Sequence, residues 1–93
     1  MPPLTYRRRE DLPFQKIEEQ ILVVDAPDRQ VHLLPETAAR IWELLAEEIT
    51  LDAITRSLVD EYDVTPERAA GETAEFLAEL GRKNMLQGNP GIP

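Results

Sequence analysis

The sequence predicts an α+β fold in which a three-stranded antiparallel β-meander is followed by three α-helices. The first reason is a change of hydrophobic period at Pro35. Short aliphatic and β-branched runs precede this proline, and apolar residues recur every three to four positions after it. The second reason is turn and cap chemistry. A Pro-Asp turn separates two strand-like runs, and a threonine precedes each of the two later helix-like segments.

Three short runs are expected to form the sheet. Phe14–Ile17 is the first strand, Glu18–Gln20 is a turn, and Ile21–Asp25 is the second strand. The second run is apolar on both faces, as expected in the middle of a small sheet. The turn Ala26–Arg29 then leads into a third strand, Gln30–Leu34, whose outer side is an open edge.

The first two helices are expected to follow directly. Pro35 suits the first turn of the first helix, because its missing N–H would have no partner there. The apolar stripe of this helix contains Ala38, Ile41, Trp42, Leu45 and Ile49. Thr50 is the expected N-cap of the second helix, whose apolar face contains Leu51, Ile54, Leu58 and Tyr62.

The third helix is expected to begin after Thr65 as N-cap, with Pro66 at its first position. Gly71 lies inside it, which should cost about 1 kcal/mol relative to alanine. Either another part of the backbone approaches closely there and requires glycine, or the helix tolerates the cost. Asn84 is the expected left-handed cap, after which Met85 and Leu86 return to the core. The apolar seam of this helix contains Ala69, Thr73, Phe76, Leu77 and Leu80.

Length and composition indicate one small globular domain. The chain has 93 residues, of which 42% are hydrophobic and 30% charged. No cysteine is present, so neither a disulfide nor a thiolate site is possible, and no signal peptide or membrane span is visible, which favours a cytoplasmic location. We expect residues 1–13 to be a flexible arm, residues 14–87 to be the domain and residues 88–93 to be a flexible tail.

The net charge constrains the partners. Eighteen acidic against ten basic side chains give a net charge of −8. A chain with this charge repels polyanions, so we expect no nucleic-acid partner and no membrane partner. A small basic or amphipathic peptide fits the charge better.

The sequence contains few residues that could catalyse a reaction. The chain has one histidine, His32, and one serine, Ser57, and nothing in the sequence activates either. His32 alternates with Val31 and Leu33, so we expect it to face solvent while those two side chains are buried. The acidic residues lack metal-ligand spacing and no phosphate-binding loop is present. We therefore expect neither an enzyme nor a cofactor.

Binding is the remaining possibility. An extended peptide could add a strand to the open edge Gln30–Leu34, with its side chains in a groove between this strand and the third helix. The alternative is that the residues assigned to this groove are ordinary core residues, and periodicity alone does not separate the two.

The sequence also resembles a known family. The run Val31–Leu44, followed by Thr50–Ile54, Tyr62–Val64, Phe76–Leu80 and Asn84–Leu86, resembles the PqqD-like proteins. Members of this family are peptide chaperones, also called recognition elements, of ribosomally synthesised and post-translationally modified peptides (RiPPs). The resemblance implies a winged-helix-like domain that binds the leader region of a precursor peptide.

The resemblance also implies a mode of binding and a set of site residues. The leader adds to the third strand beside the third helix and is presented to a modifying enzyme, either a radical S-adenosylmethionine enzyme or a leader peptidase. The residues implied on the strand are Gln30, Val31, His32, Leu33 and Leu34. Those implied on the helix are Thr73, Phe76, Leu77 and Leu80, with Glu72 or Glu75 at the rim for a basic leader residue.

Two other functions remain open at this point. Winged-helix domains often bind DNA. The third helix, however, carries four glutamates against three basic residues, and the resulting negative net charge disfavours contact with DNA phosphates. The chain could also be a structural subunit that holds a partner protein in the same groove. Because an unpaired strand edge invites self-association, we expect either a monomer or a weak homodimer.

Overall fold

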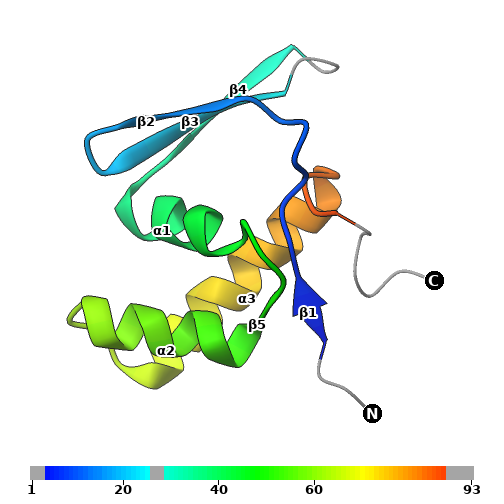
Figure 1. Ribbon diagram of the computed structural model, residues 1–93. Coiled ribbons are helices and arrows are strands. Elements are labelled where there is room, and N and C mark those ends of the chain that lie inside the picture. Colours follow the sequence, from blue (N-terminus) through cyan, green and yellow to red (C-terminus); the bar gives the residue numbers. More distant parts are fainter. Residues whose placement is uncertain (1–3, 26–28, 88–93) are drawn as a thin grey trace.

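The computed structural model describes residues 4–25 and 29–87. Figure 1 shows the three longer strands as a layer above the helices. The predicted class is confirmed: the fold is α+β, and a three-stranded antiparallel sheet precedes three helices. The elements in chain order are β1 (Thr5–Tyr6), β2 (Phe14–Ile17), β3 (Gln20–Asp25), β4 (Gln30–Leu34), α1 (Glu36–Leu44), β5 (Ile49–Thr50), α2 (Leu51–Glu61) and α3 (Pro66–Arg82).

The main sheet has the strand order β2-β3-β4, with β3 in the centre as predicted. Ile21 pairs with Leu34, and Val23 pairs with His32. Paired side chains share a face, and Ile21 and Val23 are fully buried, so this is the face that packs on the helices. The β2–β3 turn is tight, and Glu18 adopts a positive φ of 58° in it.

The first helix is shorter than its apolar stripe predicts. It ends at Leu44, and Leu45 is still buried as the chain leaves the helix. Ile49 was expected on the stripe but belongs to β5, where it pairs with Tyr6 of β1. The expectation was wrong because the partner of Ile49 lies over forty residues away and leaves no local signal.

The predicted caps of the later helices are confirmed. The Thr50 hydroxyl accepts a hydrogen bond from the Ala53 N–H at 3.1 Å. The Thr65 hydroxyl likewise accepts a hydrogen bond from the Arg68 N–H at 3.3 Å. Asn84 has a φ of 57°, the left-handed conformation expected after α3. Met85 and Leu86 then return to the core, where both are buried.

Gly71 has space around it. A Cβ atom built at this position would meet no atom within 4 Å. No close backbone approach therefore requires glycine here, and the helix tolerates its conformational cost.

The segment expected to be a flexible arm packs against the domain over its described part. Strand β1 pairs with β5, and Arg8 forms a bridge with Leu86. The Arg8 guanidinium donates to the carbonyl of Trp42 at 2.6 Å and lies over the Trp42 and Phe14 rings. Leu12 is only 4% exposed. The expectation was wrong for residues 4–13 because these contacts are long-range. Residues 1–3 and the expected tail, 88–93, lie outside the described residues.

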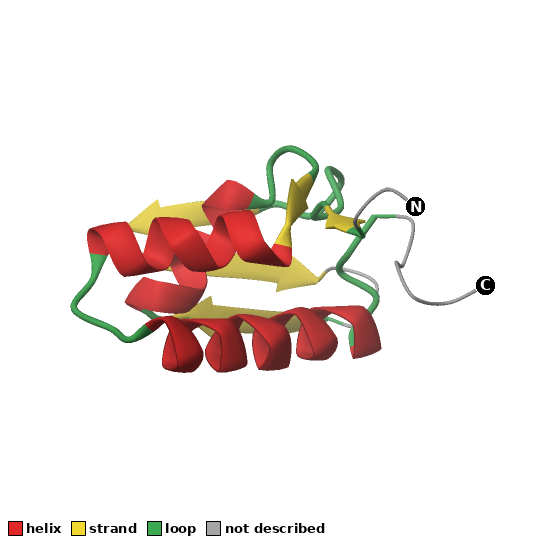
Figure 2. Ribbon diagram, turned by 90° about the horizontal axis from the view of Figure 1, so that it is seen from below, coloured by secondary structure: helices red, strands yellow, loops and turns green. Residues whose placement is uncertain are grey.

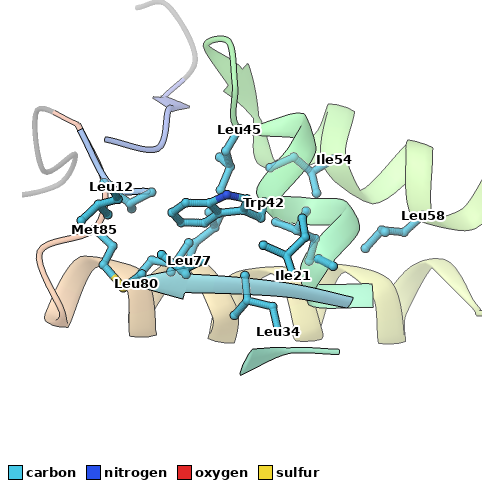
Figure 3. Close-up of a cluster of buried hydrophobic side chains, with 14 of the residues drawn as sticks. Leu12, Ile21, Leu34, Trp42, Leu45, Ile54, Leu58, Leu77, Leu80 and Met85 are labelled. Atoms are coloured by element: carbon cyan, nitrogen blue, oxygen red, sulfur yellow. The ribbon is translucent and has the colours of Figure 1, made fainter. Parts of the chain in front are cut away.

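One hydrophobic core joins the sheet to all three helices. Figure 3 shows Trp42 of α1 at its centre, between Leu12, Met85 and Leu80 on one side and Ile21 and Ile54 on the other. Trp42, Leu45, Ile54 and Leu58 are fully buried. In the part of the chain that the structure describes, no helix combines the length and apolarity that crossing a bilayer requires.

Candidate functional site

The outer edge of β4 is the first part of the candidate site. β4 bonds to β3 along one side, and no described strand pairs with its other side. Its backbone N–H and C=O groups on that side are free to bond an added strand.

The side chains of β4 alternate in the opposite sense to the prediction. Val31 and Leu33 point to the outer face and are 58% and 57% exposed. His32 is half-buried on the helix side, and Leu34 is buried there. The expectation that His32 faces solvent was wrong, because β4 is held in register with β3 and Val23 sets the buried face.

Helix α3 runs beside β4. Figure 2 shows α3 in front of the lowest strand, which is β4. The pKa of Glu79 is lowered, chiefly because Lys83 donates a hydrogen bond to its carboxylate at 2.9 Å; His32, across from α3, contributes a smaller part. The Nε2 atom of His32 is buried and has no hydrogen-bond partner among the described residues.

A groove opens where β4 ends and α1 begins. Its volume is about 380 Å³, and it lies between the first turns of α1 and the middle of α3. Ile41, Ala38 and Phe76 give it an apolar floor, and carboxylates stand at its rim. The full lining consists of Pro35, Glu36, Thr37, Ala38, Ile41, Glu72 and Phe76.

The predicted residues of α3 divide between this groove and the core. Glu72 and Phe76 line the groove. Thr73, Leu77 and Leu80 are at most 3% exposed and are buried in the core. For these three positions the structure favours the core interpretation.

Sequence reasoning missed the contribution of α1. Five groove residues belong to the stretch from Pro35 to Ile41. Ala38 and Ile41 were recognised only as members of an apolar stripe, and the sequence does not show which part of a stripe is left uncovered by neighbouring elements. Glu36 was visible only as a favourable charge in the first turn of the helix.

The groove has a negative electrostatic bias. Glu36 forms no ion pair among the described residues, and Glu72 is paired with the exposed Arg68 at 3.1 Å. A second groove of about 230 Å³ shares Thr37 and Glu72 with the first and extends to Tyr62. The pKa of Tyr62 is raised, mainly by burial and then by the neighbouring Glu36. Within the described residues, no group of histidine and carboxylate side chains could hold a metal ion.

Comparison with known proteins identifies the family. Residues 20–86 match the family described as coenzyme PQQ synthesis protein D (PqqD). The chain belongs to the PqqD family. The matched region begins with β3 and contains β4, α1, α2 and α3, so it includes every element that forms the edge and the groove.

A solved structure shares the PqqD fold of this chain. It is described as "TbiB1 in Complex with the TbiA(beta) Leader Peptide". The two chains superpose with a TM-score of 0.79 at 22% sequence identity, over 88% of this chain and 95% of the other. No curated protein sequence matches this member of the PqqD family significantly.

Proposed function

We propose that this chain binds the leader region of a ribosomally synthesised precursor peptide and presents it to a modifying enzyme. The leader adds as a strand to β4 beside α3, and the enzyme is a radical S-adenosylmethionine enzyme or a leader peptidase. The role is recognition without catalysis. Membership of the PqqD family and the leader-peptide complex of the similar solved structure both support this proposal.

The observation that carries the proposal is the unprotected edge of β4. Natural edge strands are usually blocked by charged residues, proline, bulges or a covering segment. β4 is five residues long, contains neither a charged residue nor a proline, and pairs along its whole length with β3. The opposite edge strand, β2, is four residues long, follows Pro13 and carries Lys16. An edge as open as that of β4 is typical of a strand that receives a partner.

The groove beside β4 supplies the second element of recognition. A peptide that continues past Leu34 would meet the apolar floor formed by Ala38, Ile41 and Phe76. Glu36 and Glu72 at its rim favour a lysine or arginine next to the inserted apolar side chain. The predicted ligand is therefore a short extended segment with alternating apolar residues and a basic residue at one end.

The expected affinity follows from the contacts. Main-chain bonds along β4 contribute roughly 1 kcal/mol each. One or two apolar anchors add about 1–3 kcal/mol apiece. After association costs of several kcal/mol, a dissociation constant on the order of micromolar or somewhat tighter is expected.

Fluorescence polarisation with a labelled synthetic leader tests this proposal. The leader is taken from the short open reading frame beside the gene, and the chain is tested as wild type, Phe76→Asp and Ala78→Asp. Ala78 is the matched control because it is exposed on the same helix and does not line the groove. We expect Phe76→Asp to weaken binding at least about tenfold, because it buries a charge on the apolar floor, and Ala78→Asp to bind like the wild type.

Circular dichroism shows whether Phe76→Asp remains folded. Glu72→Lys serves as a second variant, because it reverses a rim charge at an exposed position. Equal affinity of all four proteins for the leader would contradict the proposed site.

A further inference from the structure

The outer face of the main sheet carries no charge. The outer face is the side of the sheet that carries seven side chains, as strand alternation and register show. These are the side chains of Gln15, Ile17, Gln20, Leu22, Val24, Val31 and Leu33. Five of these seven residues are aliphatic and two are glutamines. In a chain with 30% charged residues, seven uncharged neighbours on one surface are unusual.

The outer face is open to solvent. All three helices pack on the opposite side of the sheet (Figures 1 and 2). Ile17 is 47% exposed, Val31 is 58% and Leu33 is 57%. Contiguous apolar side chains at this exposure are typical of interaction surfaces on soluble proteins.

The size of the outer face argues against a second copy of this chain as its occupant. Three strands at normal spacing make a face of about 15 by 20 Å, or roughly 300 Å². A stable interface buries about 800 Å² on each partner. Two copies would also bring together two chains that each carry a net charge of −8. A transient contact with a different protein fits both observations.

The border of the outer face indicates the chemistry of that partner. Glu18 lies in the β2–β3 turn at one end of the face, is exposed, and forms no ion pair among the described residues, whereas the exposed Arg29 precedes β4 at the opposite end. Val31 and Leu33 lie at its other border, on the strand whose edge we propose for the leader. A protein seated on this face would therefore lie directly beside a bound leader, where an enzyme acting on the same precursor is needed.

We infer that the outer face is the docking surface for the precursor-processing enzyme. It accepts an uncharged apolar surface that carries a basic side chain near Glu18. This inference rests on the proposed function, because it assigns the place of the enzyme relative to the leader.

The test measures binding of two partners to the same variants. The full chain is immobilised, and the purified precursor-processing enzyme encoded beside its gene is titrated by interferometry. The synthetic leader is titrated separately. The variants are Ile17→Asp, which places a charge on β2 away from the β4 edge, and Gln15→Arg, which adds a charge without removing an apolar side chain. Leu4→Asp is the matched control, because Leu4 is an aliphatic residue 53% exposed outside this sheet.

We expect Ile17→Asp and Gln15→Arg to weaken enzyme binding by about tenfold or more, since each buries an unpaired charge in the contact. The affinity of both variants for the leader should stay within about twofold of wild type. Leu4→Asp should change neither enzyme binding nor leader binding. Unchanged enzyme binding in both variants overturns the docking surface.

Two other results separate the possible failures. A wild-type dimer that Ile17→Asp converts to a monomer in sedimentation also overturns the inference, because the occupant is then a second copy. Failure of the leader to bind the wild-type chain, with enzyme binding still sensitive to Ile17→Asp, overturns the proposed function and leaves the docking surface standing.

Discussion

Leu33 and Leu34 are consecutive residues of β4 whose side chains lie on opposite faces of the sheet. Leu34 is 7% exposed and pairs with Ile21 in the core, whereas Leu33 is 57% exposed. This contrast defines the candidate site: β4 is anchored through one face, presents the other to solvent, and leaves its edge unpaired.

The two leucines should differ in their contribution to stability. Leu34→Ala removes buried atoms and should lower the free energy of unfolding by about 2–4 kcal/mol. Leu33→Ala removes exposed atoms and should change it by no more than about 0.5 kcal/mol. Urea unfolding followed by tryptophan fluorescence measures both. Equal losses would show that the strand faces are assigned wrongly.

Leu12 provides a test of the N-terminal segment. Because Leu12 is 4% exposed and belongs to the core, Leu12→Ala should lower the free energy of unfolding by about 2–3 kcal/mol. Leu4→Ala, at an exposed position of the same segment, is the control. If both variants unfold like the wild type, residues 4–13 are a flexible arm as the sequence predicted.

Replacing Gly71 should stabilise the protein. Nothing lies within 4 Å of the added Cβ, so Gly71→Ala should raise the free energy of unfolding by about 0.5–1 kcal/mol through better helix propensity. Thermal unfolding by circular dichroism measures the change. A lower melting temperature would reveal a close contact that the structure does not contain.

The ion pair between α1 and α2 predicts that the free energy of unfolding depends on pH. Arg40 donates two hydrogen bonds to Glu61 at 2.7 and 3.1 Å, which lowers the pKa of the Glu61 carboxyl below its ordinary value of 4.5. The stabilisation is therefore complete above that value and is lost as the pH falls through the lowered pKa. Both side chains are about a third exposed, so the effect is below about 1 kcal/mol.

The variant that isolates this pair is Glu61→Gln. It should flatten the acid limb of the stability curve below about pH 4.5, the ordinary pKa of a glutamate carboxyl, with no effect on the alkaline side. Urea midpoints measured across this range at low and high salt provide the comparison. An acid limb as steep as in the wild type would show that Glu61 is not the responsible group.

The local parts of the fold could be predicted from the sequence. The strand β4, both threonine caps and the left-handed Asn84 follow from residue chemistry within a few positions, and each is confirmed. The β1–β5 pairing and the burial of Leu12 could not be predicted, because their partners are distant in the chain and short strands carry little periodic signal.

The candidate site was predictable only in part. The open edge follows from the meander, but the faces of β4 depend on its register with β3, and alternation alone fits either assignment. The groove depends on which part of each apolar stripe is left uncovered. Phe76 is partly exposed there while Leu77, the next residue, is buried. That distinction arises from the packing of α3 against α1 and α2.

The most direct test of the central claim is amide chemical-shift mapping of the full chain during titration with the synthetic leader. We predict the largest shifts in Gln30–Leu34, with a second group around Glu72 and Phe76 and at the first turn of α1. Main-chain bonding at the β4 edge should also protect those amides from hydrogen exchange. Saturating leader that moves only other regions, such as β2 or α2, or that moves none, would contradict leader binding at this edge.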